Sequence, residues 1–137
     1  MVDTNVFISA CIGRGPASKV IEACIAGDVQ PVMGEKLFLE YRDVLSRDPL
    51  YATARLNHGE RASLLDVFAS KCTWHIIHFN WRPNLQDEAD NHILELAIAA
   101  DAPIIVTANT RDFHGRELKF PHISVERPEH FLRRLDE

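Results

Sequence analysis

The sequence predicts an α/β domain with a parallel sheet, and three observations support this fold class. Strand-like and helix-like segments alternate along the chain, and no internal repeat or linker interrupts them. The segment PIIVT, residues 103–107, is continuously apolar, as strands buried on both faces of a parallel sheet are. A length of 137 residues fits one domain, residues 1–137, that can bury a core of its own.

Asp3 stands near the start of the given sequence, at the front of a segment that looks suited to burial. The stretch VDTNVFISA, residues 2–10, places Asp3 ahead of β-branched and aromatic residues that look suited to burial. Only Met1 and Val2 precede it. If the chain starts here, we expect Asp3 to follow a truncated first strand and to be poorly held; the alternative is that Met1 is an internal residue of a longer product. Because Asp-Thr-Asn is also good turn chemistry, a turn or helix-capping role for Asp3 stays open.

Helical spacing of apolar residues predicts three helices in the first half of the chain. The first covers residues 17–26, after the breaker GRGP, and ends at Gly27, a common helix terminator. The second covers residues 35–46 and stops before Asp48-Pro49. The third starts after Asn57, whose side chain can cap it, and runs to about Ser70. Residues 29–33 form a short strand, although Pro31 is unusual inside one.

The second half continues the alternation. Three strands are predicted here, over residues 73–79, 103–107 and 122–126. Two helices are predicted, over residues 87–100 and residues 128–135, and the second of them begins with proline. In sheets of this kind, ligands bind outside the carboxyl ends of the strands. Polar residues that follow strands, or that open the next helix, are therefore the candidates for function.

Four groups of polar residues meet this condition, and each also has an ordinary structural explanation. Asp3 follows the first strand, Glu40 lies beside the apolar stripe of its helix, and Asp90 shares the inward face of Leu94 and Ala97. Glu40 is equally consistent with a solvated helix acid, and Asp87 is better explained as a helix cap. Asn109 and Asp112 follow residues 103–107, where either could start a short helix.

Convergence of these acids would favour a particular chemistry. Carboxylates without histidine or cysteine companions select hard cations such as Mg²⁺ or Mn²⁺. One such cation can activate a water, and a second can steady the leaving oxygen of a phosphoryl displacement. Hydrolysis of a phosphodiester is the reaction that this arrangement favours.

The composition and the residue spacing bear on other classes of protein and of site. The formal net charge of −5 lacks the basic footprint of most nucleic-acid-binding proteins, but bound cations would reverse the local sign. No apolar run is long enough to cross a membrane, and no signal peptide is evident. The three cysteines are scattered, so we expect reduced, partly buried thiols in a cytoplasmic protein. The seven histidines lack zinc-site spacing.

Four segments in order resemble the PIN-domain family, most closely its branch of VapC-like toxins from toxin–antitoxin pairs. They are DTNVFISA (3–10), LFLEYRDVLSR (37–47), DEADNHILELAIAADAPIIVTANTRDF (87–113) and VERPEHFLRRL (125–135). The resemblance implies a three-layer α/β/α domain with a central parallel sheet, whose first strand is truncated here. It also implies an Mg²⁺- or Mn²⁺-dependent endoribonuclease that cleaves single-stranded RNA, inhibited by a cognate antitoxin protein, and a homodimer.

The resemblance also implies roles for individual residues. Asp3, Glu40 and Asp90 match the first three family acids, which are catalytic and bind the metal. Asn109 stands where the fourth acid usually comes, so we assign that role to Asp112, three residues later. Asn5, Thr107 and Asn109 would line the pocket. Apart from the resemblance, Arg111 is a candidate contact for the RNA substrate because it is next to these residues in the sequence, although a solvated surface cation is the better explanation for it. The alternative is a catalytically weak PIN-like module that binds RNA or a protein partner, which the truncated start and Asn109 favour.

Overall fold

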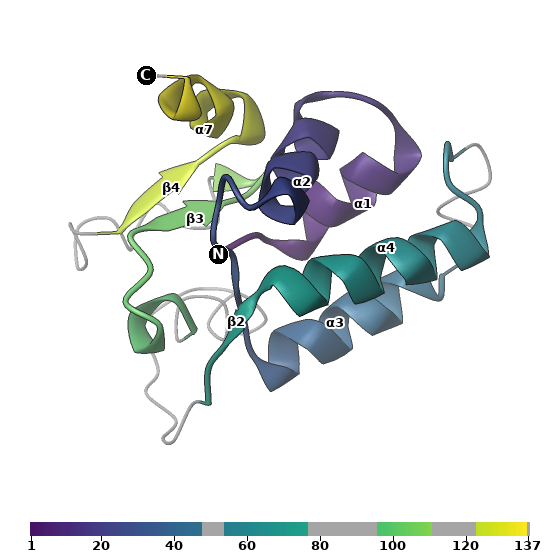
Figure 1. Ribbon diagram of the computed structural model, residues 1–137, viewed down its shortest axis with the longest axis horizontal. Helices are drawn as coiled ribbons and strands as arrows, with labels where there is room; N and C mark the ends of the chain where they lie inside the picture. The colour runs from purple at the N-terminus through teal and green to yellow at the C-terminus, as the bar shows by residue number, and fades with distance from the viewer. Residues whose placement is uncertain (48–53, 77–95, 111–122, 137) are drawn as a thin grey trace.

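The computed structural model describes residues 1–47, 54–76, 96–110 and 123–136. Figure 1 shows the elements within them: α1 (Thr4–Ile12), α2 (Pro16–Ala26), β1 (Val32–Met33), α3 (Glu35–Leu45), α4 (His58–Lys71), β2 (Thr73–Trp74), β3 (Ile104–Val106), β4 (Ser124–Glu126) and α7 (Pro128–Leu135). Residues 96–99 are also helical and belong to the helix expected over 87–100. Helices therefore alternate with strands, and the predicted α/β class is confirmed.

The strands pair in parallel, as predicted. β1 pairs with β2, with Val32 opposite Thr73 and Met33 opposite Trp74. β3 pairs with β4, and Ile105 at the centre of β3 lies opposite Val125. Parallel neighbours place the carboxyl ends of the strands of a pair at the same edge.

The first three residues lie beside β3 and continue the sheet. Val2 forms an isolated parallel bridge with Val106. The Val106 N–H donates to the Met1 carbonyl at 2.8 Å, and the Asp3 N–H donates to the Val106 carbonyl at 2.9 Å. The expectation that Asp3 is poorly held is therefore wrong. Backbone hydrogen bonds on both sides of Val2 fix the segment against β3.

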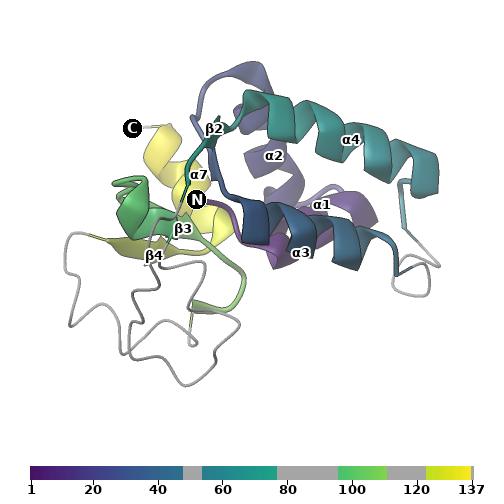
Figure 2. The same cartoon turned by 90° about the horizontal axis from the view of Figure 1, so that it is seen from below.

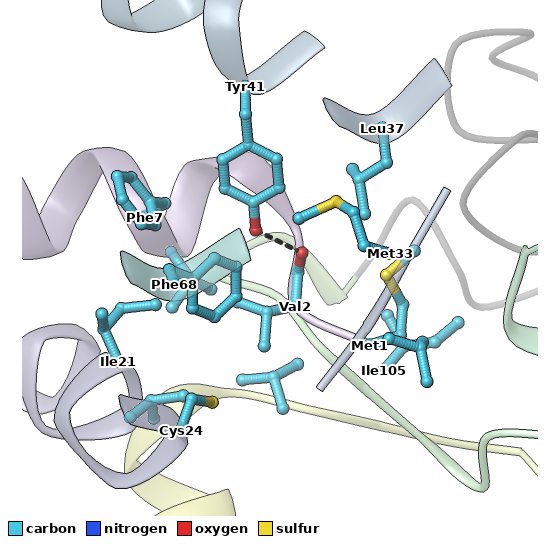
Figure 3. Packing of buried hydrophobic residues seen from close by; sticks show 14 of the residues in the cluster. Met1, Val2, Phe7, Ile21, Cys24, Met33, Leu37, Tyr41, Phe68 and Ile105 are labelled. Atoms are coloured by element: carbon cyan, nitrogen blue, oxygen red, sulfur yellow. Dashed lines mark hydrogen bonds between the residues drawn. The ribbon is translucent and has the colours of Figure 1, made fainter. Parts of the chain in front are cut away.

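Val2 lies between two helical layers. Figure 3 shows Tyr41 of α3 on one side of Val2 and Ile21 and Cys24 of α2 on the other. The Tyr41 hydroxyl donates to the Val2 carbonyl at 2.7 Å, which ties α3 directly to the strand segment. Both views of the ribbon place the N-terminus in the interior (Figures 1 and 2), and Met1 is only 7% exposed.

An aromatic cluster joins three helices in the core. The rings of Phe7 from α1 and Tyr41 from α3 meet edge to face, with centroids 5.2 Å apart. Phe68 from α4 lies 5.5 Å from Phe7 and 5.8 Å from Tyr41. Aromatic pairs at these separations contribute about 0.5–1.5 kcal/mol beyond the burial of their area. α3 and α4 lie side by side in both views (Figures 1 and 2).

The helix α1 is an element that the sequence analysis does not predict. Its Val6, Phe7 and Ile8 include β-branched and aromatic residues, which have modest intrinsic helix propensity. The helix forms because Val6 and Phe7 are fully buried, and tertiary packing outweighs propensity. Its carboxyl end is held by Arg55, whose guanidinium donates to the Ala10 carbonyl at 2.9 Å.

The other helix boundaries agree closely with the predictions. α2 ends at Gly27, whose φ of 90° lies in the left-handed region that glycine adopts easily. Asn57 caps α4 in a reciprocal capping box with Glu60, at 2.8 and 2.9 Å. The strands β1, β2, β3 and β4 are shorter than predicted. Residues 77–79, 87–95 and 122 of the predicted elements lie outside the described residues.

Two further expectations concern membranes and cysteines. None of the helices in the described parts of the chain combines the length and the apolar character that spanning a bilayer requires. Cys11, Cys24 and Cys72 are free thiols, the first two buried and the third partly buried, as expected.

Candidate functional site

Asp3 stands at the N-cap position of α1, but its carboxylate does not cap the helix. Its backbone is extended, with φ −71° and ψ 151°, and its side chain accepts no capping hydrogen bond from a backbone N–H of the first turn. Instead Oδ2 accepts hydrogen bonds from the Thr107 hydroxyl at 2.8 Å and from Asn5 Nδ2 at 3.2 Å. The capping explanation for this side chain is therefore wrong, because its carboxylate is directed to the residue that follows β3.

Thr107 connects the end of β3 to the start of α1. The residue is fully buried, and its hydroxyl donates to Asp3. The same oxygen lies within hydrogen-bond distance of Asn5 Nδ2, at 3.2 Å, and of the Asn109 backbone N–H, at 3.1 Å. One threonine thus orients the carboxylate and shapes the loop behind it.

Asn5 crosslinks the same two segments. Its Nδ2 faces both Asp3 Oδ2 and Thr107 Oγ1, and its Oδ1 accepts from the Ala108 backbone N–H at 3.1 Å. The side chain is therefore fully used in fixing the loop after β3 relative to α1. Together with Thr107, it holds Asp3 in one orientation.

Glu40 reaches the same place from α3. It is half-buried, next to the buried Tyr41, which agrees with its expected position at the margin of the apolar face. Its Oε1 accepts a hydrogen bond from the Thr4 hydroxyl at 3.0 Å. The same hydroxyl lies 3.4 Å from Asp3 Oδ1. A single side chain therefore contacts both carboxylates, although Asp3 and Glu40 are far apart in the sequence.

The electrostatics of this region disfavour further negative charge. Burial raises the pKa of the Tyr41 hydroxyl well above its ordinary value, and the neighbouring carboxylate of Asp3 raises it further. Two carboxylates in contact with one hydroxyl repel each other, and a bound cation offsets that repulsion. The side chains around them offer carboxylate, hydroxyl and amide oxygens, which are the donors that Mg²⁺ and Mn²⁺ prefer. The donor types of these described side chains are therefore ones that a hard divalent cation takes.

Several predicted site residues cannot be placed. Asp90, Arg111 and Asp112 lie outside the described residues. In the ranges that the structure does describe, no third Asp, Glu, His or Cys joins Asp3 and Glu40 in a metal-binding group. The structure thus brings together Asp3, Glu40, Asn5 and Thr107.

Asn109 takes part in this arrangement through its backbone. Its N–H donates to the Thr107 hydroxyl at 3.1 Å, and the residue as a whole is exposed to solvent. The pocket-lining role of its side chain stays a prediction.

Thr4 is a site residue that sequence reasoning missed. It is 6% exposed and opens α1, between Asp3 and Asn5. The direction of the Thr4 side chain depends on α1 being helical, and the sequence does not predict this helix. The signal that could have revealed it is a hydroxyl residue directly after the acid at the end of a strand.

A separate groove of about 690 Å³ lies between α2 and α4. Its lining includes Ala10, Ile21, Leu64 and Val67, but neither Asp3 nor Glu40. It is therefore distinct from the place where the two acids meet.

Comparison with protein families gave one match. A family model described as a PIN domain matches residues 1–111. The matched stretch includes Asp3, Glu40, Asp90 and Thr107, and it ends just before Asp112. The comparisons with curated proteins and with solved structures gave no match.

Proposed function

Because the chain belongs to the PIN domain family, we propose that it is a metal-dependent endoribonuclease that cleaves single-stranded RNA. PIN domains are generally nucleases, and this general property is the premise of the proposal. The observation that supports it best is the Thr4 hydroxyl, which lies within 3.4 Å of Asp3 Oδ1 and 3.0 Å of Glu40 Oε1. Two acids from different elements meet there, as a shared cation site requires.

In this proposal Asp3 and Glu40 hold Mg²⁺ or Mn²⁺ together with Asp90 and Asp112. The cation, when bound, supplies the positive charge that attracts the phosphate and acidifies a water. Thr107 and Asn5 orient Asp3 Oδ2, so that the carboxylate needs no rearrangement before it binds. Arg111 would contact an RNA phosphate, and Asn109 would border the pocket.

A finer part of the proposal concerns the biological context. We propose that the protein is a VapC-like toxin of a toxin–antitoxin pair, held inactive by a small cognate antitoxin. An acidic pocket favours a partner that brings a basic side chain to it, because opposite charges stabilise the complex. We also propose a homodimer in the cytoplasm, and a single PIN-like domain over residues 1–137.

The second candidate function is a catalytically weak PIN-like module that binds RNA or a protein partner. Asn109 favours it, because an amide stands where an acid is expected and a neutral side chain binds a cation less strongly than a carboxylate. The two candidates differ in one measurable respect, which is cleavage of RNA.

Cleavage of a mixed pool of single-stranded RNA tests the proposal. The full chain should cut the pool when Mn²⁺ is present in excess, and EDTA should stop the reaction. The substitutions Asp3→Asn and Asp90→Asn should each lower the rate to below about one hundredth, since each removes a metal ligand. Asp28→Asn is the matched control, because Asp28 is an exposed acid after α2, and it should cleave normally.

The outcomes separate the two candidate functions. RNA that stays intact with every divalent ion, while still binding the protein, would favour the weak module. Cleavage that persists in EDTA would contradict the role of the metal. Failure of any co-encoded small protein to bind the chain would argue against the toxin assignment but not against nuclease activity.

A further inference from the structure

We propose that the hydroxyl of Thr4 is a positioning group that sets the spacing of Asp3 and Glu40 for a shared divalent cation. This inference rests on the proposed function and assigns a role to a residue outside the set of acids. The hydroxyl donates to Glu40 Oε1 at 3.0 Å and lies 3.4 Å from Asp3 Oδ1. A hydroxyl has one hydrogen, so the shorter contact identifies Glu40 as its acceptor.

The position of Thr4 is fixed by burial and by the backbone next to it. The residue is 6% exposed and begins α1 directly after Asp3, whose N–H is bonded to the Val106 carbonyl at 2.9 Å. Its Oγ1 lies one bond from Cβ, and branching at Cβ limits its rotamers. Glu40 reaches inward through a longer side chain with three rotatable bonds. The hydroxyl is therefore a donor at a defined position for a carboxylate that ends a longer side chain.

The backbone of α3 is registered to the same segment by a second contact. Tyr41, adjacent to Glu40, donates its hydroxyl to the Val2 carbonyl at 2.7 Å, as the dashed line in Figure 3 shows. This contact sets the position of the helix, and the Thr4 contact sets the position of the Glu40 side chain. Two adjacent residues of α3 thus meet two residues that flank Asp3.

The consequence is a specific dependence of metal affinity on the hydroxyl. Groups that orient metal ligands typically contribute a factor of about 10–100 in affinity or activity. Thr4→Val has nearly the same shape and lacks only the hydroxyl, so Glu40 loses this hydrogen bond. Thr4→Ser keeps the hydroxyl and should keep the affinity.

Calorimetric titration of the metal-free full chain with Mn²⁺ tests the inference. The dissociation constant should rise about 10–100-fold in Thr4→Val. It should change less than about threefold in Thr4→Ser. Thr73→Val is the matched control, because Thr73 is an exposed threonine in β2, and its affinity should be unchanged. In RNA cleavage by Thr4→Val, the Mn²⁺ concentration that gives half-maximal rate should rise by the same factor, and saturating Mn²⁺ should restore most of the rate.

The possible results separate failure of the Thr4 positioning role from failure of the proposed function. If the unaltered chain binds Mn²⁺ and Thr4→Val binds it equally well, the positioning role is wrong while the nuclease proposal stands. If Thr4→Ser is as weak as Thr4→Val, the hydroxyl is not the cause and the inference is overturned. If the unaltered chain binds no divalent ion, this inference and the proposed function fail together. Should circular dichroism show that Thr4→Val is unfolded, Thr4→Ala takes its place in the same comparison.

Discussion

Threonine hydroxyls organise the two acids at the scale of single residues. Thr107 donates to one oxygen of Asp3, and Thr4 lies between the other oxygen and Glu40. Buried carboxylates are costly unless hydrogen bonds satisfy them. Neutral hydroxyl donors satisfy part of this requirement and leave the net negative charge in place, which is the condition that favours binding of a cation.

Removal of the Thr107 hydroxyl should destabilise the folded chain. Thr107→Val takes a donor from the buried Asp3 and an acceptor from the Asn109 N–H. We expect the free energy of unfolding, measured with urea, to fall by about 1–3 kcal/mol, because a buried polar group loses its partner. Thr107→Ser should lose less. Equal stability of Thr107→Val and the unaltered chain would show that this hydroxyl does not hold Asp3.

At the scale of elements, local signals determine what could be predicted. Gly27, Asn57 and Pro128 are explicit start or stop signals, and the helices that they bound appear where the sequence predicts them. α1 carries no comparable side-chain cap, since its Asp3 is used elsewhere. Its helical state comes from burial against α2 and α3, which only the folded structure reveals.

The candidate site could likewise be predicted only in part. Asp3 and Glu40 could be proposed because residues after strands, or at the margin of a buried face, are recognisable in a sequence. Their contact through Thr4 could not, because it depends on the direction of a side chain at the first turn of an unpredicted helix. Expected strand lengths were too long because apolar runs extend beyond the residues that form ladder bonds.

The end of the helix that includes residues 96–99 gives a stability test. Asp101 has a φ of 54°, in the left-handed region, and the Ala102 N–H closes the helix by donating to the Ala97 carbonyl at 2.8 Å. Glycine adopts this conformation without the steric cost of a Cβ atom, so Asp101→Gly should raise the free energy of unfolding by about 0.5–1 kcal/mol. Asp66→Gly, inside α4, should give no gain in the same urea titration. A loss of stability in Asp101→Gly would contradict this explanation.

At the scale of the whole molecule, three thiols should make the folded state less stable at alkaline pH. Burial raises the pKa from the ordinary 9.0 to about 11 for Cys11, about 11 for Cys24 and about 12 for Cys72. Between pH 9 and 11 the unfolded chain therefore releases protons that the folded chain retains. This stabilising contribution is complete below pH 9 and is lost as the pH rises through the folded-state values.

The urea midpoint should accordingly fall when the pH is raised from 8 to 10. Cys24→Ala removes one of the three groups, and the fall should then be smaller, even if the variant is less stable at pH 8. A midpoint whose pH dependence is identical in the two proteins would show that the Cys24 thiol keeps its ordinary pKa in the folded state.

The fold of the whole molecule brings three distant segments together around Asp3. The segment beside β3, the first turn of α1 and the middle of α3 all meet at Asp3, and helices cover the segment on two sides (Figure 3). Addition of Mn²⁺ should therefore raise the melting temperature of the unaltered chain, because a ligand that binds the folded state alone stabilises it.

Anomalous diffraction from crystals of the full chain soaked with Mn²⁺ tests the central claim most directly. We predict a manganese peak between the two carboxylates, with an oxygen of Asp3 and an oxygen of Glu40 either bound directly, within about 2.0–2.3 Å of the ion, or hydrogen-bonded to a water on it. Ordered carboxylates of Asp3 and Glu40 without a manganese peak between them, at a Mn²⁺ concentration that supports RNA cleavage, would contradict the account.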